Sequence, residues 1–335
     1  MSDDFEFKVT AKGEVDGKPT SSIDVDLTKN SVAKNALGGT ELQLIGLQKR
    51  LPKETWDKFN FIQSRVRDEF FDDRPTVLWL QDLPQDPESA HLAKETSRRR
   101  FSKIIFNSNW QQDKYHRYLG VPYEEGAVVK NAIESIPVHE KPKGDKIKLI
   151  YFSTPHRGLN VLESAVRTLS EYRDDFEVDV YSSFKIYGWE ERDEQFKELF
   201  DRLNELDCVN YYGTVSNEEI RKALTQSHIL AYPSIYEESS CCVAMEAMAA
   251  GCLAVVPNYG ALTETCTDFG WMYNWESDQK IHAQKYASIL NHAIEEYWNP
   301  GLQSVLKMQV SYYNYFYSWD YRINEWMNVL NSIED

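Results

Sequence analysis

Long hydrophobic runs are missing from this 335-residue sequence. No stretch approaches the roughly 18 consecutive apolar residues that a membrane-spanning helix needs. The opening, Met1 to Phe7, is acidic and has neither the basic start nor the apolar core of a secretory signal peptide. A basic amphipathic helix suited to a lipid surface is also lacking. We therefore expect a cytoplasmic protein with no transmembrane segment and no docking on membranes.

Cysteine is too sparse for a disulfide framework or a zinc site. The chain has five cysteines, an odd number, and none forms a C-x-x-C or His–Cys pattern at the spacing of metal ligands. No Asp-x-Asp motif lies in a loop suited to a metal. We expect the thiols to be reduced, and we expect neither a bound metal nor a permanently bound cofactor.

Positive charge is in deficit, with 37 Lys and Arg against 53 Asp and Glu and a formal net charge of −16. Such a field repels duplex nucleic acid and anionic lipid. Two short basic clusters, Arg98–Arg100 and Lys141–Lys148, are interpreted as solvated surface rather than as a nucleic-acid groove. Nucleic acid is therefore not an expected partner.

The composition that remains is that of a globular protein, 42% apolar and 13% aromatic, which argues against disorder. The length favours two domains. Short apolar runs alternate with longer amphipathic stretches, which predicts an α/β protein with largely parallel sheets. The segment around Ile136–Lys146 is rich in Pro, Lys and Gly, and we place a domain boundary there. The expected parts are an N-terminal domain (1–137), a C-terminal domain (138–310) and a C-terminal helix (311–335).

The alternation is most regular in the second half, where it predicts a doubly wound sheet whose ligands bind at the carboxyl ends of strands. The segment from Met1 to Leu27 alternates as strands do but indicates little else. The expected strands are 76–80, 103–107, 147–152, 176–181, 209–212, 229–232 and 253–256. The expected helices begin at Gly39, Ala90 and Asn109 or span 158–172, 193–206, 217–226, 241–250 and 311–335.

The strand, loop and helix between His228 and Val256 give the clearest indication of a site. The loop leads into a helix whose free N–H groups and positive dipole end suit a diphosphate. Glu238 lies in that loop and Glu246 lies about one turn inside the helix, so two carboxylates can accept hydrogen bonds from sugar and ribose hydroxyls. The ordinary alternative is a solvated capping Glu beside a salt-bridged helix Glu.

The stretch YPSIYEESSCCVAMEAMAAGCLAVVPNYGALTE resembles the donor-binding signature of retaining GT-B glycosyltransferases of family 4. This resemblance implies two Rossmann-like doubly wound domains that face a cleft, with the C-terminal helix packing back toward the N-terminal domain. It also implies that Glu238 binds hydroxyls of the donor sugar and that Glu246 binds the nucleotide ribose. The helix start that would cradle the phosphates comprises Ser239, Ser240, Cys241, Cys242 and Val243.

Further matches follow in the order of the family. NALGGTELQ resembles the glycine loop that approaches the donor phosphate, and YFSTPHRGLNVLESA resembles the segment in which a basic residue, here Arg157, clamps the pyrophosphate. GTVSNEEI matches the turn near the nucleotide base, although an ordinary turn capped by Asn217 explains it nearly as well. The resemblance thus adds Gly38, Gly39, Thr40, Ser153, Arg157 and Gly213–Val215 to the donor site.

The sequence departs from the family in three places. Ser153 stands where many relatives carry a second basic residue; Lys185 is a candidate substitute, although a solvated lysine is the simpler interpretation. WLQDLPQD has Gln81 before Asp82 where relatives often have His before Asp, so Asp82 either orients the acceptor or caps a helix. The loop after Glu238 lacks the common Gly-Phe-Gly, so the donor sugar cannot be inferred from the family.

The resemblance implies a retaining, metal-independent transfer of a hexose from a UDP-sugar, preferred over a GDP-sugar, to a saccharide or other hydroxyl acceptor in polysaccharide biosynthesis. Arg157 would meet the charge on the leaving diphosphate, Glu238 would position the sugar and Asp82 would orient the acceptor. The alternatives are a catalytically silent nucleotide-sugar binding protein of the same fold, a nucleic-acid base glucosyltransferase, and a hydrolysing epimerase that uses His156 or Asp82.

Overall fold

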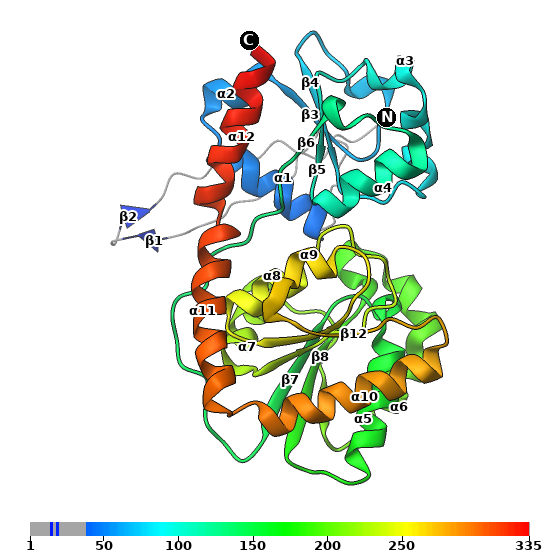
Figure 1. Ribbon diagram of the computed structural model, residues 1–335, viewed down its shortest axis with the longest axis vertical. Coiled ribbons are helices and arrows are strands. Elements are labelled where there is room, and N and C mark those ends of the chain that lie inside the picture. Colours follow the sequence, from blue (N-terminus) through cyan, green and yellow to red (C-terminus); the bar gives the residue numbers. More distant parts are fainter. Residues whose placement is uncertain (1–13, 16–17, 20–37, 335) are drawn as a thin grey trace, which may run out of the picture.

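Two parallel sheets organise the described part of the computed structural model, which comprises residues 14–15, 18–19 and 38–334. In Figure 1 the sheets lie one above the other, each with helices along its sides. The N-terminal sheet has the strand order β3-β4-β5-β6, and the C-terminal sheet has the order β12-β11-β10-β7-β8-β9. Neighbouring strands in both sheets are parallel, which confirms the α/β prediction.

The bounds of the elements are as follows. The strands are β1 (Glu14–Val15) and β2 (Lys18–Pro19), which form an antiparallel pair, β3 (Asn60–Gln63), β4 (Thr76–Leu80), β5 (Lys103–Phe106), β6 (Gly126–Val128), β7 (Ile147–Phe152), β8 (Phe176–Tyr181), β9 (Val209–Tyr211), β10 (Ile229–Ala231), β11 (Leu253–Pro257) and β12 (Trp271–Tyr273). The α-helices are α1 (Gly39–Arg50), α2 (Lys53–Lys58), α3 (Glu95–Arg98), α4 (Asn109–Leu119), α5 (Leu159–Ser170), α6 (Lys197–Asn204), α7 (Asn217–Gln226), α8 (Cys242–Ala249), α9 (Leu262–Cys266), α10 (Gln279–Glu296), α11 (Pro300–Phe316) and α12 (Trp319–Glu334). The 3-10 helices are η2 (Asp68–Phe70), η3 (Pro87–Ala93), η4 (Tyr123–Glu125), η5 (Pro155–Arg157), η6 (Phe184–Tyr187), η7 (Glu190–Phe196) and η8 (Thr267–Phe269).

The sequence pattern predicts the buried elements best. The strands at 76–80 and 176–181 and the helix at 217–226 occur as expected. The helix expected from Ala90 is wrong, because a 3-10 helix and the four-residue α3 stand there. The helix expected at 193–206 is 3-10 through Phe196, and it becomes α-helical only where Leu199 and Leu203 give it a buried face. The interpretation of Met1 to Leu27 lies outside the described residues, apart from β1 and β2.

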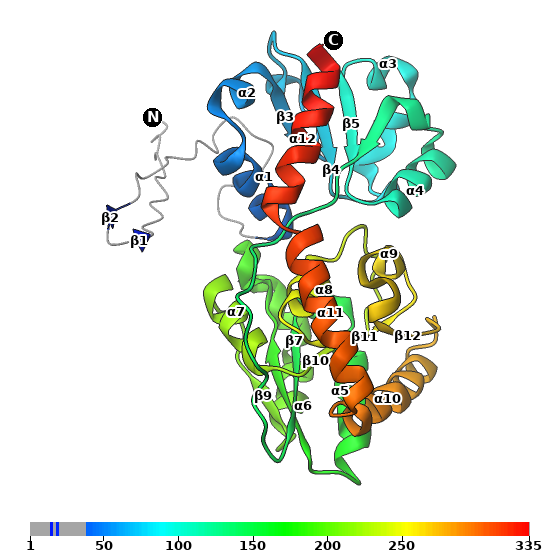
Figure 2. The same cartoon turned by 60° about the vertical axis from the view of Figure 1, so that its left-hand side comes forward.

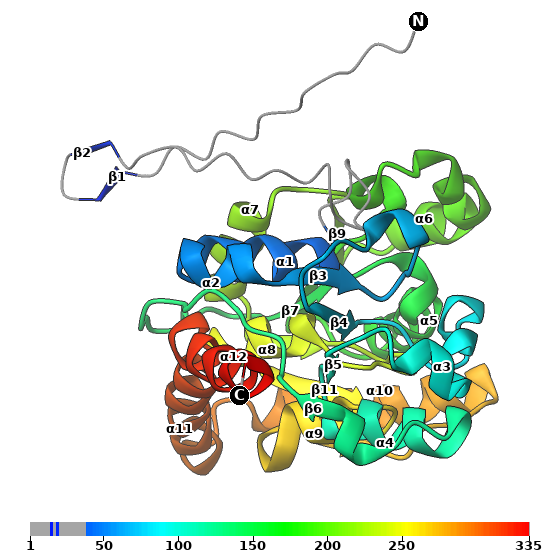
Figure 3. The same cartoon turned by 90° about the horizontal axis from the view of Figure 1, so that it is seen from above.

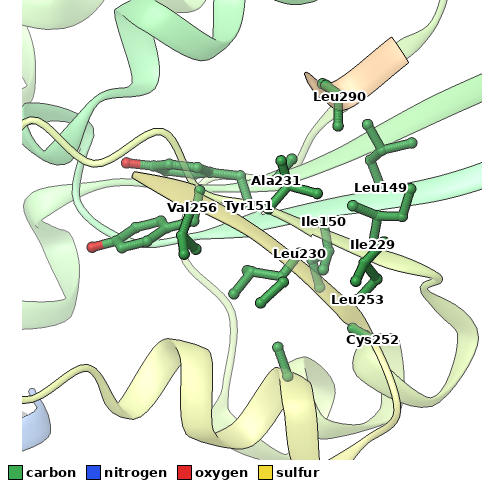
Figure 4. Packing of buried hydrophobic residues seen from close by; sticks show 14 of the residues in the cluster. Leu149, Ile150, Tyr151, Ile229, Leu230, Ala231, Cys252, Leu253, Val256 and Leu290 are labelled. Atoms are coloured by element: carbon green, nitrogen blue, oxygen red, sulfur yellow. The ribbon is translucent and has the colours of Figure 1, made fainter. Parts of the chain in front are cut away.

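The central strands of the C-terminal sheet are buried on both faces, as expected of parallel strands covered by helices. Figure 4 shows Leu149 and Ile150 of β7 beside Ile229 of β10 and Leu253 of β11, all of which are buried. Burying each such side chain contributes roughly 1.5–3 kcal/mol. This core fixes the strand order, and the strand order fixes which loops meet at the carboxyl edge.

The C-terminal helices cross from one domain to the other. Figure 2 shows α11 lying along the C-terminal domain and α12 along the N-terminal domain. Trp326 of α12 packs edge-on against Trp79 of β4, with ring centroids 4.7 Å apart. Gly46 of α1 lets the Trp319 ring approach, since a Cβ there would lie 2.1 Å from it. The expected return of the C-terminal helix is thus confirmed, although two helices make it rather than one.

Helices cover both faces of the N-terminal sheet. Seen from above in Figure 3, α1 and α12 lie on one side of the β3–β6 strands and α3 and α4 on the other. The carboxyl ends of these strands point toward the C-terminal domain, so the loops after them face the loops of the lower sheet (Figure 1).

Two cations expected to be solvated are not: Arg98 is buried and Lys141 is partly buried. Arg98 is 8% exposed, and its Nε donates to Glu125 Oε2 at 2.6 Å. Lys141 donates from Nζ to the carbonyl oxygen of Leu224 at 2.6 Å, and burial lowers its pKa. These members of the basic clusters therefore hold the fold together.

Candidate active site

A crevice opens where the strand order of the C-terminal sheet reverses, between β7 and β10. The loop after β7 carries Ser153 and Arg157, and the loop after β10 carries Glu238. Two adjoining cavities, of about 660 and 480 Å³, occupy the space between these loops and the N-terminal domain. We call them the larger cavity, which contains Glu246, and the smaller cavity, which contains Arg157 and Glu238.

The expected site residues all line one or both of these cavities. The larger cavity is lined by Gly38, Gly39, Ser153, Gly213, Thr214, Val215, Cys242, Val243 and Glu246. The smaller cavity is lined by Gly39, Thr40, Asp82, Ser153, Arg157, Glu238, Ser239, Ser240, Cys241, Cys242 and Val243. Because Gly39, Ser153, Cys242 and Val243 belong to both sets, the cavities form one continuous cleft.

Arg157 and Glu238 form an ion pair at the base of the smaller cavity. Arg157 Nη1 donates to Glu238 Oε1 at 2.6 Å, and the hydroxyl of Tyr232 donates to the same oxygen at 2.6 Å. Glu238 is 5% exposed, and the Arg157 guanidinium lies 4.2 Å from the ring centroid of Tyr236. Burial alone would lower the pKa of Arg157. The adjacent carboxylate of Glu238 outweighs this effect, so the pKa lies above its usual range.

Glu246 projects from α8 into the larger cavity. Burial raises the pKa of its carboxyl, while Arg221 lowers it through an Nε···Oε1 approach of 3.8 Å. The other side chains of α8 are mostly small and buried, including Ala244 and Ala247. A half-buried carboxylate with one distant cationic partner can accept hydrogen bonds from hydroxyl donors.

The start of α8 is held by the N-terminal domain. Ser239 accepts a hydrogen bond from Asn107 Nδ2 at 3.2 Å and donates to the carbonyl oxygen of Gln81 at 2.9 Å. The thiol of Cys242 accepts from Gln43 and Asn131 at 3.7 Å each. Ser240 Oγ is buried and lines the smaller cavity with no hydrogen-bond partner among the described residues. The N–H groups at this helix end carry no side-chain cap.

The glycine loop lies against an aromatic ring of the other domain. A Cβ on Gly38 would lie 2.2 Å from Tyr187 Cε1, so only glycine permits this contact. Tyr187 follows β8 and lines both cavities. The sequence pattern indicated Gly38 as a site residue, and the structure shows that the approach of Tyr187 requires a glycine there.

Asp82 lies in the smaller cavity and caps no helix. The cap of η3 is Asp86, whose side chain accepts from the Glu88 N–H at 2.9 Å. Burial raises the pKa of Asp82, and the neighbouring Asp86 carboxylate raises it further. Its backbone is held by Ser64, a non-glycine residue at φ 55°, whose Oγ accepts from the Asp82 N–H at 3.2 Å. Backbone strain of this kind often accompanies functional loops.

The turn after β9 is formed by Gly213 at φ 67°. The helix that follows is capped by Ser216 in a reciprocal capping box with Glu219, so the expected cap at Asn217 is wrong. This leaves the backbone of Gly213–Val215 facing the larger cavity.

Sequence reasoning missed an aromatic shelf formed by Phe184, Tyr187 and Trp189. Tyr187 and Trp189 stack with ring centroids 5.2 Å apart, and Arg192 lies 4.3 Å from the centroid of Trp189. Its sequence signal is FKIYGW directly after a strand, where ligands of doubly wound sheets bind. Lys185 does not line either cavity; it is 65% exposed and pairs with Glu190 at 2.7 Å.

His156 stacks on Phe184 with ring centroids 5.3 Å apart. Burial lowers the pKa of His156 to about 4, and the positive charges of Arg157 and Arg192 contribute to this shift. The imidazole is therefore neutral near pH 7. A neutral His156 cannot act as the cationic general acid of a hydrolysing epimerase.

A second set of contacts joins the two domains at Glu264, on α9. Its carboxylate accepts from the backbone N–H groups of Asn109 and Trp110 at 3.1 and 2.9 Å, and it pairs with Lys130. It thus caps α4, a helix of the other domain. Burial would raise its pKa, but Lys130 and the α4 N–H groups outweigh this and lower it.

We expect Glu264→Gln to lower the free energy of unfolding by about 2 kcal/mol at pH 7, the scale of charged hydrogen bonds. Because the pKa is lower in the folded state, this contribution is present above the ordinary value of 4.5 and fades as the pH falls below it. Urea unfolding at pH 7 and pH 3.5 measures both. Glu295→Gln, which removes an exposed pair with Arg173, is the control and should change little. Equal losses for the two variants would contradict the role of Glu264.

Two kinds of feature are not found in the described residues. No described helix has the length and apolar content to cross a membrane. Within residues 38–334 and the β1–β2 pair, no group of three or more His, Cys, Asp or Glu side chains is arranged to hold a metal ion.

The fold is similar to that of solved glycosyltransferases. A glycosyltransferase from Rickettsia africae has a TM-score of 0.68 at 14% identity, covering 93% of this chain and 85% of that one. Anabaena HepE in complex with UDP and glucose has a TM-score of 0.65 at 17% identity, covering 88% and 84%. Sucrose-phosphate synthase from Thermosynechococcus elongatus has a TM-score of 0.62 at 14% identity, covering 82% and 73%. These likenesses confirm the GT-B fold.

The family comparison concerns the C-terminal domain. The family Glycosyl transferases group 1 matches residues 133–297. The sequence has no match among the curated proteins with which it was compared. Residues 133–297 thus form a Glycosyl transferases group 1 domain, which together with the two-domain fold indicates that this protein is a glycosyltransferase.

Proposed function

We propose that this protein moves a hexose from a UDP-sugar to a hydroxyl of a saccharide acceptor, with retention of configuration and without a metal, as in family 4. One observation carries the proposal: a continuous cleft at the strand-order reversal brings Glu246, Arg157 and Glu238 to one wall. The neighbouring structure of HepE was solved with UDP and glucose and also with UDP-glucose. These complexes favour UDP over GDP as the donor nucleotide.

The larger cavity suits the nucleoside. Glu246 would accept hydrogen bonds from both ribose hydroxyls, and the backbone of Gly213–Val215 would face the base. The diphosphate would lie where the cavities join, against Ser153, the glycine loop and the uncapped start of α8. The sugar would then lie in the smaller cavity beside Glu238.

The transfer forms a bond from the acceptor oxygen to the anomeric carbon and breaks the bond from that carbon to the diphosphate. The acceptor proton passes to the departing phosphate oxygen. Arg157 and the α8 N–H groups would stabilise the charge that develops there. Glu238 is held by Arg157 and Tyr232, so its assigned role is to position the sugar. Asp82, on the opposite wall, would orient the acceptor hydroxyl.

Thermal unfolding with UDP, GDP, ADP, dTDP and CMP tests the proposal. A ligand at 100 times its dissociation constant adds about 2.7 kcal/mol to stability, so UDP should raise the melting temperature visibly. Hydrolysis or transfer from UDP-sugars, followed by release of UDP, then reports turnover. Stabilisation by UDP without turnover on any UDP-sugar would favour the silent binding protein. A larger shift with GDP than with UDP would overturn the donor assignment.

Gly38→Ala tests the glycine loop. The added methyl group displaces the Tyr187 ring, at about 1–3 kcal/mol for overpacking. Since Tyr187 lines both cavities, we expect UDP to bind about 10-fold more weakly, measured by calorimetry. The matched control is Gly144→Ala, where a Cβ meets nothing within 4 Å. If Gly38→Ala keeps the UDP affinity of the control, the contact with Tyr187 has no part in donor binding.

A further inference from the structure

The smaller cavity is lined by several carboxylates, which offset much of the positive charge that a diphosphate would need. Arg157 lines it, but Glu238 binds that guanidinium at 2.6 Å and neutralises it. The same cavity is lined by the carboxylates of Glu41, Asp82 and Asp86. A donor with two anionic phosphates therefore needs a further cation that no carboxylate already holds.

Two other arginines line this cavity, Arg65 and Arg192. Arg65 lies close enough to Glu41 and Asp82 for its positive charge to oppose the rise in the pKa of both carboxyls. Arg192 forms no ion pair and no side-chain hydrogen bond with a carboxylate among the described residues. Among the described arginines that line the smaller cavity, Arg192 is thus the one without a carboxylate as an interaction partner.

Two of the four acidic residues of η7 are engaged elsewhere, and no described ion pair joins Arg192 to the other two, Glu191 and Glu194. Asp193 accepts from the Phe184 N–H at 2.8 Å and from the hydroxyl of Ser183. Glu190 pairs with Lys185. Arg192 is therefore left beside the aromatic shelf without an acidic partner from its own segment.

The aromatic shelf orients the Arg192 guanidinium. Its central carbon lies 4.3 Å from the ring centroid of Trp189 and 5.9 Å from that of Phe184. Trp189 stacks on Tyr187, which packs against Gly38 at the junction of the two cavities. Cation–π contact fixes the guanidinium but leaves its N–H donors unused.

We propose that Arg192 binds the distal phosphate of the donor together with Arg157, and that it adds positive charge because Glu238 offsets part of the charge of Arg157. The inference rests on the proposed function, because it assigns a ligand group to the same cleft. Both arginines flank His156, whose ring stacks on Phe184. A phosphate that contacts both arginines would receive hydrogen bonds from two guanidinium groups.

Calorimetry of the full chain with UDP and with UMP tests this assignment. Arg192→Ala should weaken UDP binding about 10- to 100-fold, the scale of charged hydrogen bonds, and leave UMP binding unchanged. Arg192→Lys should retain part of the UDP affinity. Lys185→Ala, in the same segment but outside the cavities, is the matched control and should bind UDP as wild type does.

The other outcomes separate the two proposals. If wild type binds UDP and Arg192→Ala binds it equally well, the assignment of Arg192 is overturned while the proposed function stands. An equal loss for UDP and UMP would also overturn it, since the distal phosphate would not be the group recognised. If UDP affinity is kept and the KM for the acceptor rises, Arg192 belongs to the acceptor side instead. If wild type binds neither nucleotide, the proposed function fails first.

Discussion

Glu246→Ala is expected to raise the dissociation constant for UDP about 100-fold. The carboxylate would accept two hydrogen bonds from the ribose, each worth roughly 1.5–3 kcal/mol because the acceptor is charged. In the alanine variant, water would replace the carboxylate and restore part of this binding free energy. Isothermal calorimetry measures the change directly. Glu218→Ala, on the exposed side of α7, is the matched control. Equal UDP affinity in the two variants would contradict the assignment of Glu246.

The same position should show a gain in stability when the charge is removed. Burial raises the folded-state pKa of Glu246, so the ionised carboxylate costs stability as the pH rises through that value. Without ligand, Glu246→Gln should therefore be more stable than wild type at pH 8, and the difference should vanish below pH 4.5, the ordinary value. A variant that loses ligand and gains stability indicates a functional rather than a structural carboxylate.

Arg157→Ala is expected to lower the free energy of unfolding by about 3–5 kcal/mol, because among the described residues it leaves the buried Glu238 charge with Tyr232 as its remaining side-chain partner. Turnover should fall about 100- to 1000-fold, since a donor to the leaving diphosphate is lost. Urea unfolding and initial rates measure the two effects separately.

A double variant separates structure from chemistry at this pair. Arg157→Met with Glu238→Gln removes both charges, and a buried pair replaced by neutral groups of similar volume often costs little stability. We expect stability near that of wild type and no recovery of turnover. Recovered turnover in the double variant would show that the pair serves the fold alone.

The C-terminal half was predictable because its strands are buried on both faces. Such strands are continuous apolar runs, as at Ile229–Ala231 and Leu253–Pro257, and the helices between them have one apolar face. The loops after the strands follow directly from that pattern. Ser153, Arg157 and Glu238 were therefore expected at one edge, and they line one cleft.

The sequence places aromatic residues after a strand, but the contact of the aromatic shelf with the glycine loop could not be predicted, because it depends on the other domain. The acidic run from Glu190 to Gln195 has no apolar period, and 3-10 turns have no clear sequence rule. Tyr187 becomes part of the cleft only through Gly38, which is 149 positions away in the chain. The contact of Glu264 with the start of α4 could not be predicted from the local sequence pattern either, because it forms only where the two folded domains meet.

The break between α11 and α12 gives the two domains a shared pivot. Within residues 38–334 the chain passes between the domains near Ile133 and again near Ser318, and these two passages are bonded to each other, from the Ile133 N–H to the Tyr317 carbonyl oxygen at 2.9 Å. Both passages therefore turn about one axis, and rotation there would widen the cleft while leaving each sheet intact. In Figure 1 these passages lie at the edge occupied by α11 and α12. Glu264, on α9, contacts the start of α4 in the other domain, so any such rotation would have to break these hydrogen bonds.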